Sequence, residues 1–466
     1  MENFIATVSE INGVINGFAW GPLMLLLLVG TGVYLTVRVK WLQVTHFGRI
    51  LKNTIGTLFA KQEAKDHGAN IPAFHAVTTA LAGTVGTGNI AGVTGAIFTG
   101  GAGAVFWMWV AAFFGMVTKY AEILLAMKFR VKDEDGRYHG GPMYYIENGI
   151  GKSWKWLAII FALLGGLASF GIGNIAQSNE IAGAMSDLFH LPPLVSGIII
   201  AAIAALVTLG GIKRIGAVTS LLVPFMSIFY IIAGIVLIIM RIGDVPAAFA
   251  QIFAGAFSFK SVGGGLFGYT IMMAMRQGFA RGVFSNEAGL GSAPIAHAAS
   301  STEEPCEQAI WGVFEVFIDT IVICSITAMA VILSGVLNVE GGLDAYASKG
   351  AAAAAAFNTI LPGTFGGLII ELSLLFFALS TILSWAYYGE NCWGYLTNNN
   401  KVIVTAYKVI FSLVCIVGAV GSGTLMWDIA DTLNGLMAIP NLIALLMLSG
   451  VVTSVTKEYF SKNMLK

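Results

Sequence analysis

The sequence predicts an all-α polytopic membrane protein with about eleven transmembrane helices, because apolar runs of about 20 residues follow one another along nearly the whole chain. Apolar residues make up 57% of the 466 residues and charged residues only 11%, with a mean hydropathy of +0.81. Soluble domains carry about 25% charged residues. Two of the runs are interrupted by glycine and small polar residues. We therefore expect a single membrane domain over residues 1–466.

The composition also argues against several classes of function. The net charge is zero, so nucleic acid is not an expected partner. The four cysteines form no CxxC pair, and the six histidines contain no i,i+4 pair that would suit a metal or haem. An enzyme would need either a base paired with a nucleophile or a set of metal ligands, and the sequence shows neither at a convincing spacing. We expect neither an enzyme nor a bound cofactor.

The expected spans, in chain order, are 16–37, 72–100, 104–127, 155–187, 194–212, 216–240, 262–296, 308–337, 364–388, 402–420 and 428–452. With the N-terminus outside, the cytoplasmic segments would be 38–70, 128–155, 213–214, 276–281, 401–408 and the tail from 453. These segments hold all but four of the 25 Lys and Arg residues. Positive residues concentrate in cytoplasmic loops, so the distribution predicts N-terminus outside and C-terminus inside. Segment 38–70 would be interfacial.

The two interrupted spans carry "TALAGTVGTGNIAGV" at 79–93 and "IMMAMRQGFARGVFSNEAGLGSAP" at 271–294. They lie five spans apart, so they cross the membrane in opposite directions. Broken helices at matching positions of two halves are typical of transporters built as inverted repeats. The sequence thus predicts a repeat of five plus five helices, 72–240 and 262–452, preceded by one extra N-terminal helix at 16–37.

Unwound backbone at membrane depth is tolerated where it lines a cavity or binds a ligand. We assign the first break to substrate binding, with Thr84 beside it and the backbone N–H groups of Gly86, Thr87, Gly88 and Asn89 facing a carboxylate. The alternative for these glycines is close helix packing. A dinucleotide-binding loop is excluded, because no strand precedes the glycines.

Three stretches, "GTVGTGNIAGV", "RQGFARGVFSNEAGLGSAP" and "GGPMYYIENG", resemble the alanine or glycine:cation symporter family, and the resemblance covers essentially the whole chain. It implies a leucine-transporter-like fold and uptake of alanine or glycine, a small amino acid, with Na⁺ or H⁺ as coupling ion. The lipid bilayer of the plasma (cell inner) membrane would be the other partner. We expect the chain to function as a monomer.

The resemblance also implies a Na⁺ site between the first broken helix and the ninth span. Its ligands would be the Ser380 and Thr381 hydroxyls, the Phe377 carbonyl, and the carbonyls of Ala82 and Val85. Oxygen atoms alone suit a hard cation. The alternative is that the two hydroxyls only bond carbonyls of their own helix.

Further substrate contacts are expected on three other spans. In the fourth span, Phe170, Asn174 and Gln177 recur at helical spacing; in the seventh, Met273, Gln277 and Gly278 lie in the interrupted stretch. We expect freed carbonyls around 273–275 to take the ammonium group. Trp385 would cap the pocket, or else belong to the aromatic belt at the membrane interface.

Several ionisable residues at membrane depth need partners. Glu315 and Asp319 would share a helix face and form a cation path or a proton site; the alternatives are pairing with Arg276 or Arg281, or a place near a helix end in water. Lys119 and Glu122, three residues apart, are expected to pair with each other.

We expect secondary active import of a small neutral amino acid with Na⁺ by alternating access. H⁺ coupling and a larger neutral amino acid are the alternatives. A channel would instead show rings of like residues in a symmetric oligomer, and the inverted repeat argues against it.

Overall fold

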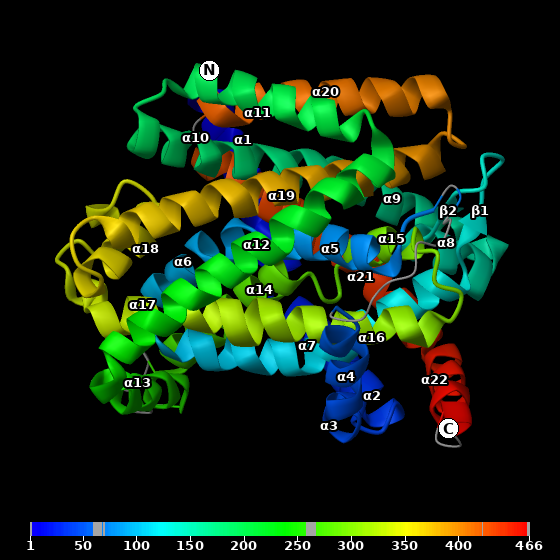
Figure 1. Ribbon diagram of the computed structural model, residues 1–466, viewed down its shortest axis with the longest axis horizontal. Coiled ribbons are helices and arrows are strands. Elements are labelled where there is room, and N and C mark those ends of the chain that lie inside the picture. Colours follow the sequence, from blue (N-terminus) through cyan, green and yellow to red (C-terminus); the bar gives the residue numbers. More distant parts are fainter. Residues whose placement is uncertain (1, 59–67, 69, 258–266, 422, 464–466) are drawn as a thin grey trace.

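The computed structural model describes residues 2–58, 68, 70–257, 267–421 and 423–463, and shows a bundle of long helices packed side by side (Figure 1). Within these residues, eight helices are long and apolar enough to cross a membrane, and one bent pair adds a ninth. The shorter apolar helix α11, Pro193–Thr208, falls in the expected span 194–212.

The chain begins with α1, Glu2–Ala19, and α2, Pro22–Arg38, which together form one apolar span over Thr7–Arg38. The extra N-terminal helix therefore starts earlier than the expected residue 16. Two short helices follow, α3 at Leu42–Thr45 and α4 at Phe47–Leu58.

The first interrupted span is broken where the glycines lie. Helix α5, Ala73–Thr84, ends before Val85; a single 3₁₀ turn, η1, covers Thr87–Asn89; and α6, Ala91–Gly100, continues at an angle of 52°. The expected interruption of this helix is confirmed.

Long helices complete the first half of the chain. In order, the elements are α7 (Gly103–Lys128), β1 (Val131–Lys132), β2 (Tyr138–His139), α8 (Pro142–Tyr145), η2 (Ile146–Ile150), η3 (Lys152–Trp154), α9 (Lys155–Phe170), η4 (Gly171–Ile175), α10 (Ala176–Phe189), α11, α12 (Gly211–Met240), η5 (Ile242–Asp244) and α13 (Val245–Phe257). The two strands form an antiparallel hairpin with Val131 opposite His139 and Lys132 opposite Tyr138. The turn η4 is π-helical and joins α9 to α10.

The second interrupted span breaks later than the sequence predicts. Helix α14 runs unbroken over Phe267–Asn286, and the chain unwinds only at 287–292 before α15, Ala293–Ala298. The expected freed carbonyls at 273–275 are therefore inside a helix. Residues 276–281, expected as a cytoplasmic segment, lie within this same helix.

The remaining elements of the second half are α16 (Pro305–Val316), η6 (Phe317–Cys324), α17 (Ser325–Ser334), η7 (Val336–Asn338), η8 (Gly342–Ala345), α18 (Lys349–Ile360), α19 (Phe365–Leu396), α20 (Lys401–Val420), α21 (Gly423–Met447) and α22 (Ser449–Asn463). The turn η6 is π-helical. Helices α18 and α22 lie at opposite ends of the bundle (Figure 1).

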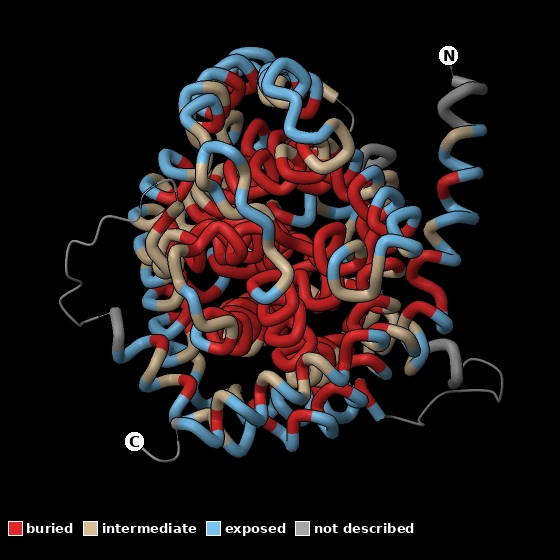
Figure 2. Tube along the Cα trace, turned by 90° about the vertical axis from the view of Figure 1, so that its right-hand side faces the viewer, coloured by how far each residue is buried: buried red, intermediate tan, exposed pale blue. Residues whose placement is uncertain are grey.

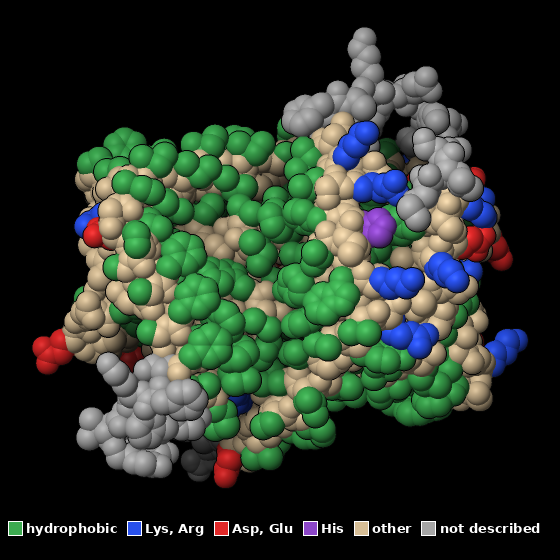
Figure 3. Space-filling view, turned by 90° about the horizontal axis from the view of Figure 1, so that it is seen from below, with side chains coloured by type: hydrophobic (Ala, Val, Ile, Leu, Met, Phe, Trp, Pro, Cys, Tyr) green, Lys and Arg blue, Asp and Glu red, His purple; other side chains and the backbone are tan. Residues whose placement is uncertain are grey.

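The surface of the bundle is apolar where a lipid bilayer would surround it. On α12, large apolar side chains at 221, 225, 228 and 232 are between 57% and 78% exposed and form one stripe. Buried residues fill the centre of the molecule (Figure 2). On the face in Figure 3, apolar side chains dominate and Lys and Arg gather toward one end. The chain is a multi-pass membrane protein.

Candidate functional site

Helices α5 and α19 bring four of the five expected Na⁺ ligands together. The Ser380 hydroxyl donates to the carbonyls of Ala82 at 3.3 Å and Phe377 at 2.9 Å, and the Thr381 hydroxyl donates to the same carbonyls at 3.1 and 2.9 Å. All four residues are buried. The fifth, Val85, lies where α5 ends, and among the described residues its carbonyl accepts no hydrogen bond from the two hydroxyls.

We call these four residues the oxygen cage. Its donor set consists of two carbonyls and two hydroxyls and contains no carboxylate, which fits a hard monovalent cation. The carbonyl of Ala82 already accepts two hydroxyls, and a bound cation would take the place of those hydrogens. The residues present therefore fit Na⁺.

The break in the first helix lies directly against the cage. A methyl group at Gly86 would lie 2.5 Å from the Thr381 hydroxyl oxygen, so only glycine allows this approach. The Gly86 amide donates to the side-chain oxygen of Asn89 at 2.8 Å, and the Asn89 amide donates to the Gly86 carbonyl at 3.2 Å. The turn uses two of the four expected N–H groups itself. The amides of Thr87 and Gly88 stay available to a carboxylate, since neither has a partner in the part of the chain that the structure describes.

Two buried oxygen atoms near this break lack hydrogen-bond partners among the described residues: the Thr87 hydroxyl and Oε1 of Gln177. The Gln177 oxygen lies 3.8 Å from the position of a methyl group on Gly86, and its amide nitrogen donates to the Ile172 carbonyl at 3.0 Å. Unpaired buried polar atoms are costly, and a polar ligand at this point would satisfy them.

Asn174 and Phe170 do not join Gln177 at the break. Asn174 donates to the Phe411 carbonyl at 2.6 Å, and the Phe170 ring packs against Tyr407 and Phe411 of α20. The expectation of a shared face is wrong because the π-helical turn η4 adds a residue to the turn and shifts the helical register.

Met273, Gln277 and Gly278 do not lie at the second break either. They face α6 and α7: the Gln277 side chain and the Met273 carbonyl contact Gly100, and Gly278 packs on Trp107. This follows from the continuous helix α14, which places these residues well before its end at Asn286. We correct their assignment to helix packing.

Trp385 lies inside the bundle, with 1% of its surface exposed. Its indole N–H donates to Glu287 at 2.8 Å, and its side chain packs on Gly173 of η4. The alternative of an interfacial belt residue is therefore wrong. Glu287 is the first residue after α14 and has a positive φ of 57°, a conformation uncommon outside glycine. Trp385 thus connects α19 with the second break.

The Phe284 side chain of α14 lies against the first break, a position that the sequence does not predict. Its ring lies 3.1 Å from where a methyl group on Gly88 would be, and it stacks on Trp427 with ring centres 5.8 Å apart. Arg281 lies over the same ring and forms an ion pair with Asp431 of α21 at 2.9 Å. The only sequence signal for Phe284 is its place within the interrupted stretch.

The buried charges pair differently from the expected pattern. Lys119 does not pair with Glu122; its ammonium lies 3.5 Å from Glu315. Glu122 instead accepts the amides of Gly289 and Gly291 at 3.1 and 3.0 Å.

The carboxylates of the eighth expected span do not pair with Arg276 or Arg281. Glu315 lies 2.8 Å from the His297 ring in addition to its contact with Lys119. Asp319 accepts Asn89 at 2.6 Å and Ser285 at 2.9 Å. Asp319 therefore connects the first break to η6 and α14.

Three comparisons with known proteins bear on this geometry. The family model described as "Sodium:alanine symporter family" matches residues 5–466. The sodium/alanine symporter AgcS of Methanococcus maripaludis is 48% identical over 97% of both chains. A Bacillus subtilis protein named a probable sodium/glutamine symporter, GlnT, is 36% identical over 97% of this chain and 91% of its own. The crystal structure of MhsT in complex with L-phenylalanine covers 82% of this chain and 97% of its own at 14% identity, with a TM-score of 0.57.

The apolar helices and the likeness to MhsT define a multi-pass membrane protein with a leucine-transporter-like fold. The family match and the identity to the M. maripaludis protein are specific enough to go further. The chain belongs to the sodium:alanine symporter family.

Proposed function

We propose that the protein imports alanine or glycine together with Na⁺ by alternating access. The observation that carries the proposal is the position of Thr381: its hydroxyl belongs to the oxygen cage and also lies against Gly86 of the first break. An ion at the cage and an amino acid at the break would therefore order the same few residues.

The amino acid would bind with its carboxylate on the amides of Thr87 and Gly88 and with polar contacts to the Thr87 hydroxyl and Gln177. The two unpartnered buried oxygens support this arrangement. Thr84 and Asn89 would support the site without contacting the amino acid through their side chains, because the Thr84 side chain is bonded to Lys119 and the Asn89 side chain to Asp319.

A small cargo is favoured by what surrounds the break. Phe284 packs on Gly88, while Trp385 fills the space at Gly173. The B. subtilis relative whose name gives glutamine makes a larger neutral amino acid the alternative to test.

We assign the two repeats to 72–240 and 262–452, with the segment 38–70 at the cytoplasmic interface. The N-terminus would face outward in the cell inner membrane, and the monomer would be the working unit. The distribution of Lys and Arg supports this orientation.

The proposal is tested by uptake of labelled alanine into proteoliposomes, with an inward Na⁺ gradient or with choline in its place. We expect uptake that requires Na⁺ and is inhibited by unlabelled glycine but not by leucine or glutamine. Inhibition by glutamine would instead indicate that the substrate is a larger neutral amino acid. Uptake driven by a pH gradient without Na⁺ would replace the coupling ion and direct attention to Glu315 and Asp319.

A further inference from the structure

Lys119 is a fully buried cation in the middle of α7, far from the expected loops. Its ammonium group donates to the Thr84 hydroxyl at 3.1 Å and to the Asn286 carbonyl at 2.8 Å, and lies 3.5 Å from Glu315. The ammonium thus donates hydrogen bonds to two helices, α5 and α14, and forms an ion pair with Glu315 on a third, α16. Such an arrangement fixes the side chain in one position.

Two of these partners are the last residues of the two interrupted helices. Thr84 ends α5 directly before the first break, and Asn286 ends α14 directly before the second. A cation is favoured at such positions, because the carbonyls at a helix C-terminus carry partial negative charge. One ammonium group therefore lies at the C-terminal ends of both helices, bound to a carbonyl of α14 and to a side-chain hydroxyl of α5.

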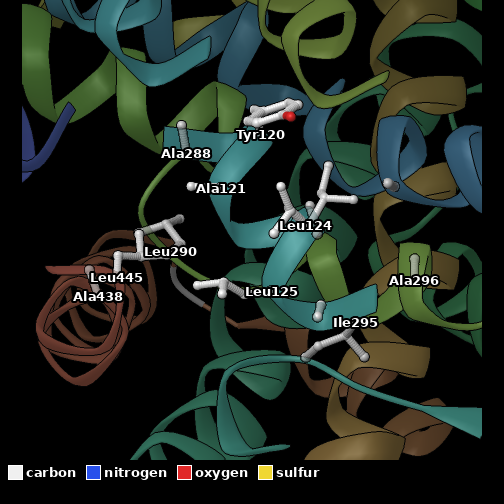
Figure 4. Packing of buried hydrophobic residues seen from close by; sticks show 14 of the residues in the cluster. Tyr120, Ala121, Leu124, Leu125, Ala288, Leu290, Ile295, Ala296, Ala438 and Leu445 are labelled. Carbon is white, nitrogen blue, oxygen red and sulfur yellow. The ribbon is translucent and has the colours of Figure 1, made fainter. Parts of the chain in front are cut away.

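Glu122, one turn further along α7, binds the other side of the second break through the amides of Gly289 and Gly291. Apolar side chains of α7 also lie beside the second break, as Figure 4 shows for Ala121, Leu125 and Leu290. Helix α7 thus packs against the second break, and Lys119 also connects α7 to the helix that ends at the first break.

We propose that Lys119 is a positioning residue that ties the two helix breaks together and so places the last turn of α5 for cation binding. That turn contains the Ala82 carbonyl of the oxygen cage, two residues before Thr84. Movement of α5 away from α14 would have to break the contact between Lys119 and Thr84. The part of this inference that concerns Na⁺ rests on the proposed function; the tie between the breaks does not.

The variants must avoid leaving a buried unpaired charge, which is strongly destabilising. Lys119→Met combined with Glu315→Gln removes the ammonium and neutralises its carboxylate partner. Thr84→Val keeps the shape and removes the contact of Lys119 with α5, together with the bond of the Thr84 hydroxyl to the Ala80 carbonyl of its own helix at 2.9 Å. Thr94→Val is the matched control: Thr94 is also buried, and among the described residues its hydroxyl bonds only the carbonyl of Ile90, the residue before α6, at 2.8 Å.

Hydrogen exchange measured by mass spectrometry on the purified protein tests the tie without any substrate. We expect faster exchange in peptides from both breaks, 79–90 and 283–293, in the Lys119→Met, Glu315→Gln variant. Thr84→Val should affect the first break alone, and Thr94→Val neither. Unchanged exchange at either break in the double variant would overturn the tie.

Sodium dependence then tests the consequence for the cage. We expect the half-saturating Na⁺ concentration for uptake to rise about tenfold or more in the double variant and in Thr84→Val, consistent with loss of a charge-assisted hydrogen bond, while the maximal rate changes less. If uptake by the wild type depends on Na⁺ and the variants have the same half-saturating Na⁺ concentration, Lys119 does not position α5 for cation binding. A wild type without any Na⁺ response would instead refute the proposed function, and the exchange experiment would still decide the tie.

Discussion

In the proposed function, Thr381 is the residue where the ion site and the amino-acid site would meet. Its hydroxyl bonds the Ala82 and Phe377 carbonyls and lies beside Gly86. Binding at two such neighbouring sites is reciprocal, so each ligand strengthens the other by the same factor. A single hydroxyl can therefore influence both affinities.

Thr381→Ala is expected to weaken Na⁺ and alanine binding together, each by about 2- to 10-fold, the usual worth of one hydrogen bond. The measurement is the Na⁺ dependence of alanine uptake. Ser373→Ala is the control, because Ser373 lies on the same helix and its hydroxyl bonds only the Ile369 carbonyl, at 2.7 Å, within the part of the chain that the structure describes. An unchanged Na⁺ midpoint for Thr381→Ala would remove Thr381 from the cage.

Gly86→Ala is expected to abolish uptake, since the new methyl group would lie 2.5 Å from the Thr381 oxygen. In Gly183→Ala, on α10, the added methyl would have no side chain or other helix of the described residues within 4 Å, and the change should stabilise the helix by up to about 1 kcal/mol. Uptake and thermal unfolding of both variants check this. Normal uptake by Gly86→Ala would contradict the close approach of α5 and α19.

At the scale of elements, the departures from straight helices decide which residues reach the site. The first break follows from the glycines and Thr, Asn side chains of 83–89, so the sequence predicts it well. The second break is displaced to 287–292, because Met273 to Asn286 contains enough good helix formers, such as Met, Ala, Arg and Gln, to continue α14. The π-helical turn η4 has no sequence signal that separates it from an ordinary helix, so the orientation of Asn174 could not be predicted.

Two glutamines test this reading of the elements. Gln177→Leu should raise the half-saturating alanine concentration about tenfold, because the Gln177 side chain of α10 lies against the first break, between α5 and α6. Gln277→Leu should leave it within about twofold, because Gln277 packs against Gly100. Competition binding with alanine on both variants is the measurement. Equal losses would place α14 at the substrate after all.

At the scale of the whole molecule, the apolar exterior and the family match agree on a multi-pass transporter. The buried charges are arranged around α7, which contacts both broken helices. Composition predicts the membrane class and the spacing of breaks predicts the repeat, but long-range pairs such as Lys119 with Glu315 depend on helix packing that no local pattern encodes.

The central claim is that the cage and the break form one coupled site. The most direct test is equilibrium binding of labelled alanine to the purified protein over a series of Na⁺ concentrations, at constant ionic strength with K⁺ as replacement. We expect alanine affinity to rise about 5- to 150-fold with Na⁺, a coupling of about 1–3 kcal/mol, and Thr381→Ala to reduce that factor. Alanine affinity that is the same in Na⁺ and K⁺ would contradict the account.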